Sequence, residues 1–201
     1  PEQQGERRVT LCKFAQLPLL QVAYHSPAAA DPDYVPLDVL ERILLKGESS
    51  RLYQRLVDKE QVAISVSGGQ SPHIDPFLFQ FEVQPRDGVA IERIEQLLYE
   101  ELGRVQTALV EERELQKAKN NAVAEFYRDM KTINGKANAL GTYDVIFGDY
   151  RKLFQTVDTI NRVTREDLQR VARKYFNARN RTVAILVPEE PTDKPAGKEQ
   201  P

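Results

Sequence analysis

Hydrophobic and polar residues alternate along five short segments of the chain, the pattern of strands that turn one face toward a core. In 77–83, for example, Phe77, Phe79 and Phe81 fall on one side of the predicted strand. The five segments are 7–13, 17–25, 62–66, 77–83 and 182–187.

Between these strands the apolar residues recur every three or four positions, which predicts amphipathic helices. Gly47 is placed to end the first helix, and Thr164 with Asp167 forms the pattern of a capping box at the start of the last one. The predicted helices are 36–46, 50–57, 89–105, 111–130, 134–147, 150–160 and 164–176.

Strands and helices do not alternate strictly, so the order argues against a doubly wound parallel sheet. It predicts an α+β fold, a mostly antiparallel sheet with helices packed on one side, in which 62–66 and 77–83 pair antiparallel. We expect one domain over 7–188, a linker remnant over 1–6 and a disordered tail over 189–201, where Pro, Glu, Lys and Gly dominate.

The composition narrows the classes of function. Lysine and arginine number 28 against 30 acidic residues, with the signs interspersed, so no basic stripe indicates nucleic-acid binding. No apolar run approaches the roughly 18 residues of a membrane helix. The single cysteine, Cys12, has no partner for a disulfide or a zinc knuckle. Because the chain begins with Pro1, we expect it to be a piece of a longer protein, and its compartment, bacterial periplasm or cytoplasm, stays open.

Few residues carry obvious chemistry. The two histidines, His25 and His73, are isolated from each other and from the cysteine, so a self-contained zinc site is not expected. No phosphate-binding glycine loop occurs. Ser49 and Ser50 lack the G-x-S-x-G elbow of a nucleophile, and their position predicts that one of them caps the helix that follows.

Three segments, in this order, resemble the pitrilysin and mitochondrial-processing-peptidase family of zinc metallopeptidases. The first, LERILLKGESSRLYQRLVDKEQVAISV, contains Gly47, Ser49, Ser50, Arg51 and Tyr53; the others are YEELGRVQTALVEERELQKAKNNAVAEF and INRVTREDLQRVARKYFNARNRTVAILVPE. Members of this family close homologous α+β domains around an unfolded peptide, and their zinc motif, H-x-x-E-H, lies in the amino-terminal domain. The motif is absent here, so the resemblance implies the carboxy-terminal, inactive domain, with no cofactor of its own and zinc in a missing amino-terminal domain.

One departure from the family pattern concerns catalysis. In family members whose inactive domain assists catalysis, an arginine and a tyrosine follow the S-S-R-L-Y segment. This chain has Val57 and Ile64 at those positions. Neither side chain can donate a hydrogen bond to a developing oxyanion. The resemblance therefore implies that this domain cannot complete an active site directly, and a partner peptidase-like subunit, as in heterodimeric bacterial members, could supply these groups. Arg51 and Tyr53 are either structural or substrate-facing.

The leading hypothesis is a non-catalytic domain that forms one wall of a peptide-binding chamber against the amino-terminal catalytic domain of the same protein. The alternative is a structural module, similar to the core subunits of a respiratory complex, that has the fold without proteolysis. A serine hydrolase using Ser49 or Ser50 is a third class.

Overall fold

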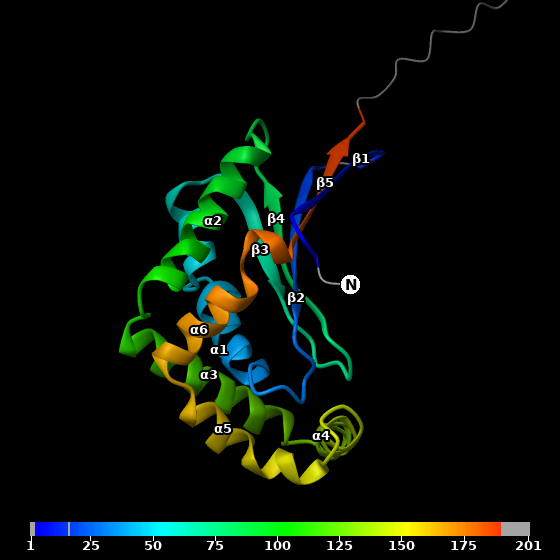
Figure 1. The fold of residues 1–201 in the computed structure, drawn as a ribbon, viewed down its shortest axis with the longest axis vertical. Coiled ribbons are helices and arrows are strands. Elements are labelled where there is room, and N and C mark those ends of the chain that lie inside the picture. Colours follow the sequence, from blue (N-terminus) through cyan, green and yellow to red (C-terminus); the bar gives the residue numbers. More distant parts are fainter. Residues whose placement is uncertain (1–2, 16, 190–201) are drawn as a thin grey trace, which may run out of the picture.

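The computed structural model describes residues 3–15 and 17–189, and Figure 1 shows its helices gathered on one side of a twisted sheet. The strands are β1 (Arg7–Lys13), β2 (Leu19–Ser26), β3 (Ala63–Gly69), β4 (Phe77–Pro85) and β5 (Arg181–Pro188). The helices are α1 (Tyr34–Leu45), α2 (Ile91–Thr107), α3 (Glu112–Asp129), α4 (Ile133–Val145), α5 (Thr156–Arg162) and α6 (Arg165–Tyr175), with a π-helix η1 (Tyr53–Lys59) and two 3₁₀ segments, η2 (Tyr150–Gln155) and η3 (Ala178–Asn180).

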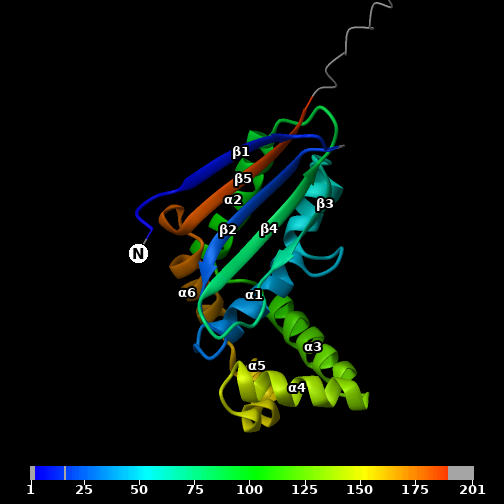
Figure 2. The same ribbon diagram turned by 90° about the vertical axis from the view of Figure 1, so that its right-hand side faces the viewer.

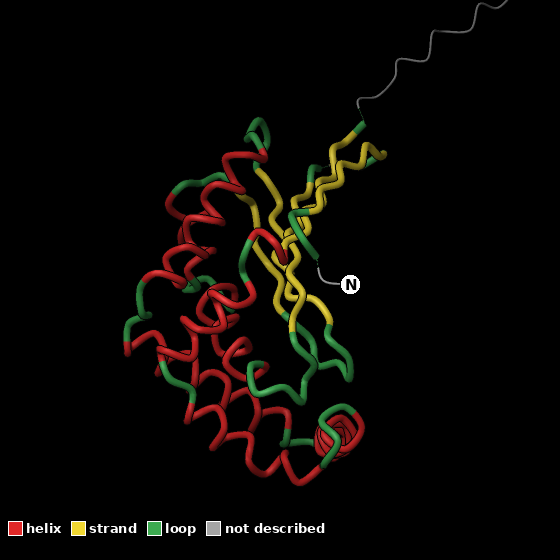
Figure 3. The backbone as a smooth tube through the Cα atoms, viewed as in Figure 1, coloured by secondary structure: helices red, strands yellow, loops and turns green. Residues whose placement is uncertain are grey.

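The sheet has the strand order β1-β5-β2-β4-β3. Every neighbouring pair is antiparallel except β1 with β5, which is parallel, so the first and last strands of the domain lie side by side. The predicted antiparallel pairing of β3 with β4 and the α+β fold with helices on one side are both confirmed (Figures 1 and 3).

Alternation along the strands determines which face is covered. In β2 and β4 every second residue is buried beneath the helices, and Phe79 and Phe81 are fully buried, but Phe77 at the start of β4 is 43% exposed. Phe176, just after α6, packs on both of these rings and on Tyr24, at ring-centre distances of 5.0 to 5.6 Å. The two sides of the core are therefore joined by aromatic contacts between the sheet and α6.

The opposite face of the sheet carries no helix in the described part of the chain (Figure 1). It is polar toward β3 and β4, where the Gln21 amide donates to the Gln80 side chain at 2.9 Å. Toward β1 it becomes apolar, and Val9 and Leu11 are 44% and 47% exposed. Antiparallel sheets commonly keep one such face open.

Two glycines let the end of β3 approach its neighbours closely. Gly68 has φ +136°, and a Cβ there would lie 2.0 Å from the Gln80 carbonyl oxygen. Gly69 lies against the buried Glu41 carboxylate, which accepts the Gln70 backbone N–H at 2.8 Å. Burial raises the pKa of Glu41, while this N–H and Lys46 act in the opposite direction. The helix α1 is thus fixed to the end of the strand.

The helices α3, α4 and α5 extend past the end of the sheet (Figure 2). Helix α4 contains no buried residue, unlike the helices that cover the sheet. No helix in the described residues is long and apolar enough to cross a membrane.

Several local predictions are confirmed. Gly47, which follows the C-cap residue Lys46 of α1, has φ +80°, and the capping box of Thr164 with Asp167 is present at α6. The strand over 7–13 begins and ends as predicted. The predicted tail lies outside the described residues from 190 onward, and the domain boundaries stay a prediction.

Two helices differ from the prediction. The helix expected over 150–160 begins as the 3₁₀ segment η2, because the Asp149 side chain and backbone accept the N–H groups of Arg151 and Lys152. The helix expected over 50–57 becomes the π-helix η1, in which the Glu60 N–H donates to the Arg55 carbonyl, five residues earlier.

Candidate functional site

The turn after α1 holds the serines of the most distinctive sequence segment. The Ser50 N–H donates to the Gly47 carbonyl at 3.0 Å, and the Gln54 N–H donates to the Ser50 carbonyl. The Ser50 hydroxyl is buried and has no hydrogen-bond partner among the described residues. The predicted serine cap is therefore wrong, because Ser50 Oγ has no hydrogen-bond partner in the described residues and Ser49 Oγ accepts from a side chain of α3 rather than from a backbone N–H.

The exposed Ser49 hydroxyl accepts a hydrogen bond from the Lys117 ammonium group of α3. A serine–lysine pair resembles part of a nucleophilic site, but a reaction would also need oxyanion donors and a substrate cavity. The space beside this pair, lined in part by Ile43 and Asn121, has a volume of only about 30 Å³. This volume has room for about one water molecule and not for a substrate.

Arg51 joins two helices through carboxylates. Its Nε and Nη2 donate to the two oxygens of Glu114 in α3 at 2.9 and 2.6 Å, and its Nη1 donates to Glu101 of α2 at 3.3 Å. The fork of Glu114 raises the pKa of Arg51, and the guanidinium in turn holds the pKa of Glu114 below its usual range. All three nitrogen atoms of this side chain donate to carboxylates inside the domain, which favours a structural role.

Tyr53 begins η1, is half-buried and packs against the hydrophobic core. The two positions that follow it in the family pattern differ in exposure. Val57 is buried in η1 with 8% of its surface exposed, whereas Ile64 is 47% exposed on β3. The structure thus places one of these two positions inside the domain and the other on its surface.

The two histidines make separate contacts. His25 makes a hydrogen bond with the Asn180 side chain through Nδ1 at 2.9 Å, and His73 stacks against Phe77 with ring centres 3.9 Å apart. Cys12 is exposed and free. Among the residues that the structure describes, no three histidine, cysteine, aspartate or glutamate side chains come together as a metal site.

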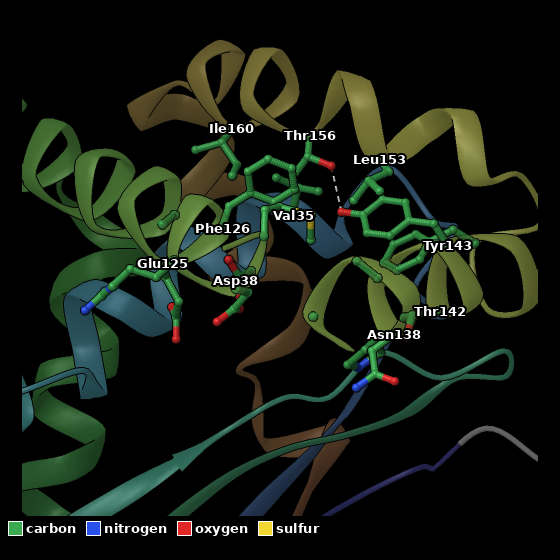
Figure 4. Close-up of a pocket in the computed structure, with 18 of the residues that line it drawn as sticks. Val35, Asp38, Glu125, Phe126, Asn138, Thr142, Tyr143, Leu153, Thr156 and Ile160 are labelled. Carbon is green, nitrogen blue, oxygen red and sulfur yellow. Dashed lines mark hydrogen bonds between the residues drawn. The ribbon is translucent and has the colours of Figure 1, made fainter. Parts of the chain in front are cut away.

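A pocket with a volume of about 730 Å³ lies between α1, α3, α4, η2 and α5 (Figure 4). This volume falls within the roughly 300–1,000 Å³ of typical ligand pockets. Tyr143 and Phe147 stack with ring centres 4.5 Å apart, and the Tyr143 hydroxyl is held by Thr156 Oγ1 at 2.7 Å. Aromatic rings fixed in this way form a rigid wall.

Polar groups meet this wall from two helices. Asp38 of α1 faces the pocket, and its Oδ2 accepts a hydrogen bond from Arg42 Nε at 3.2 Å. The same guanidinium donates to Glu125 of α3. The Asp38 side chain lines the pocket and is 30% exposed, and burial raises the pKa of its carboxyl. On α4, Asn138 and Thr142 also line the pocket.

None of these pocket residues was singled out in the sequence. The available signals were weak: Asp38 and Arg42 are charged residues one helical turn apart in a mostly apolar helix, and Asn138 and Thr142 have the same spacing. Because the walls come from separated segments, only the fold brings them together.

Comparison with known proteins identifies relatives of the chain. The family described as "Peptidase M16 inactive domain" matches residues 1–122. The zinc protease PqqE of Helicobacter pylori is 29% identical over 194 residues, which cover 94% of this chain and 42% of that protein. The chain thus spans less than half the length of this relative.

Solved structures show the same fold. A protease from Helicobacter pylori superposes with a TM-score of 0.88 at 26% identity, covering 94% of this chain and 46% of that one. The inactive peptidase domain of a candidate zinc protease from Bordetella parapertussis has a TM-score of 0.80 at 30% identity, covering 92% of this chain and 98% of that one.

Proposed function

Because the chain belongs to the Peptidase M16 inactive-domain family, we propose that it is the non-catalytic domain of a zinc-dependent endopeptidase, forming one wall of a peptide-binding chamber. The opposite wall would be a zinc-bearing amino-terminal domain of the same protein. The observation that carries this proposal is the sheet, which is covered by helices on one face and left open on the other in the described residues.

Zinc does not fit the residues present in this domain. A zinc site needs three or four nitrogen, sulfur or oxygen donors at one point. His25 is engaged with Asn180, His73 is stacked on Phe77, and no acidic cluster adjoins either histidine in the described part of the chain. The proposed role of this domain is therefore to bind and orient a peptide, while the zinc chemistry belongs to the other domain.

The sheet also supports peptide binding at its margins. β1 and β3 are the outer strands, and each has one edge without a strand partner among the described residues. An extended peptide can pair with such an edge through main-chain hydrogen bonds, which tolerate many side chains. This mode of binding suits a chamber that accepts unfolded substrates.

Val57 and Ile64 affect how the active site would be completed. Neither side chain carries a donor for a substrate carbonyl, and Val57 is also buried. We therefore assign the arginine and tyrosine of the family pattern to a separate peptidase-like subunit.

The test uses the parent polypeptide. Its residues before Pro1 are first read for H-x-x-E-H; decay of this motif would favour the structural alternative. Peptide cleavage is then compared between the parent protein and a version that lacks 7–188, with the 201-residue chain added back separately. We expect cleavage to fall on deletion and to recover in part on addition. Full activity without 7–188 would refute the proposed wall.

A further inference from the structure

The pocket between α1, α3, α4, η2 and α5 has an excess of acidic groups. Asp38 and Glu125 share the single guanidinium of Arg42. Asp129 and Arg128 also line the pocket, and Arg128 directs its Nε to a carbonyl of its own helix. The ionisable groups that line the pocket are thus three carboxyl groups and two guanidinium groups, so acidic groups outnumber basic ones by one.

Among these carboxylates, Asp38 is the one placed to accept hydrogen bonds from a second cation. Its one hydrogen bond in the described structure, with Arg42, is long at 3.2 Å and occupies only Oδ2. Lys46, a further cation that acts on Asp38, is bound to Glu41 at 2.9 Å. In Figure 4 the Asp38 carboxylate points into the open space of the pocket. A carboxylate removed from bulk water gains most from a second cation.

The aromatic walls of the pocket favour a planar cation. Phe126, Tyr143 and Phe147 line the pocket, and the ring of Tyr34 meets Phe147 edge-on at 5.9 Å. A guanidinium group is planar, stacks on aromatic faces and donates several N–H groups at fixed angles. A lysine ammonium is strongly hydrated and gains less from such walls.

We propose that this pocket binds the side chain of an arginine residue presented by a peptide. The aromatic rings contact its hydrocarbon stem and the plane of its guanidinium group, and Asp38 accepts its N–H groups. Asn138 and Thr142 lie on the α4 side of the pocket, within the lining that the peptide backbone would meet. This inference rests on the proposed function only in taking the ligand to be a peptide; it requires neither zinc nor cleavage.

The test is a titration of the isotopically labelled 201-residue chain, followed by NMR amide shifts, with a short acetylated and amidated peptide containing one arginine. A matched peptide contains citrulline, which has the same shape without the charge, and free arginine amide tests a small molecule as the source of the guanidinium. We expect saturable shifts at pocket residues, binding at least roughly tenfold weaker for the citrulline peptide, and weaker binding of free arginine amide.

Two variants examine the pocket itself. Asp38→Asn keeps the size of the side chain and is expected to weaken binding of the arginine peptide roughly tenfold or more. Asn138→Arg supplies a guanidinium from the protein and is expected to block binding. Asp144→Asn, an exposed position of α4 outside the pocket, is the matched control and is expected to bind normally.

Equal affinity for the arginine and citrulline peptides, unchanged binding by Asp38→Asn, tighter binding of free arginine amide than of the peptide, or no saturation at millimolar peptide would each overturn the inference. The proposed function is judged separately, because cleavage by the parent protein does not depend on this titration.

Discussion

Replacing Arg51 by methionine separates the structural from the substrate-facing role of this residue. Methionine keeps an apolar stem of similar length but removes the guanidinium group that joins α2 to α3 through Glu101 and Glu114. The Arg51 side chain is 22% exposed and that of Glu101 is 6% exposed, so the pair lies between a surface and a buried ion pair.

The magnitude follows from these contacts. A hydrogen bond to a charged group contributes about 1.5–3 kcal/mol, and an exposed ion pair at most about 1 kcal/mol. Glu101 retains Arg104 as a partner at 3.0 Å, which limits the cost of leaving its carboxylate behind. We expect Arg51→Met to lower the free energy of unfolding by about 2 kcal/mol.

Urea unfolding followed by circular dichroism measures this loss. With an m-value near 2 kcal/mol per molar urea, the midpoint should fall by about 1 M. The matched control is Arg165→Met, whose pair with Glu112 spans 3.4 Å between side chains 38% and 70% exposed; we expect a change within about 0.5 kcal/mol. If Arg51→Met is as stable as this control but loses peptide binding, Arg51 is substrate-facing and the structural assignment is wrong.

Other outcomes follow from burial, backbone conformation and charge. Val57→Arg places a cation at a buried position and should lower the free energy of unfolding by about 3 kcal/mol. Ile64→Tyr, at a 47% exposed position, should change it by less than about 1 kcal/mol. Equal stability of both variants in thermal unfolding would mean that the position of Val57 reaches solvent. Gly68→Ala should lower the free energy of unfolding by about 2 kcal/mol or more, because a Cβ would lie 2.0 Å from a carbonyl oxygen and φ is +136°. Its control, Gly103→Ala, lies in open space on α2 and should raise the free energy of unfolding by about 0.5–1 kcal/mol. Unchanged stability of Gly68→Ala would contradict the close approach of β3 to β4. The guanidinium partner of Glu114 lowers the pKa of this carboxyl in the folded state, so the stability that it contributes is complete above its unfolded pKa of about 4.3 and is lost as pH falls through the lower folded value. The urea midpoints of wild type and Glu114→Gln should therefore converge in acid. A difference that stays constant with pH would contradict the ion pair.

The sequence predicts the sheet well for a physical reason. Alternation in β2 and β4 reports directly which side chains enter the core, and local hydrogen bonds fix the capping box of Thr164 with Asp167. The π-helical form of the helix predicted over 50–57 is harder to predict, because a π-helix differs from an α-helix in its hydrogen bonds while the spacing of apolar residues stays almost unchanged.

The candidate pocket was not predictable for a different reason. Its aromatic wall and Asp38 come from segments about 100 residues apart, and no segment alone indicates a pocket. The roles of Ser50 and Arg51 likewise depend on contacts across the fold. The Ser50 hydroxyl is buried and caps no helix, and Arg51 binds carboxylates on α2 and α3.

The central claim is that catalysis lies outside this domain, and zinc analysis of the purified 201-residue chain together with a peptide-cleavage assay tests it most directly. The account predicts less than stoichiometric zinc and no turnover by this chain alone. One tightly held zinc per chain with robust cleavage would contradict it.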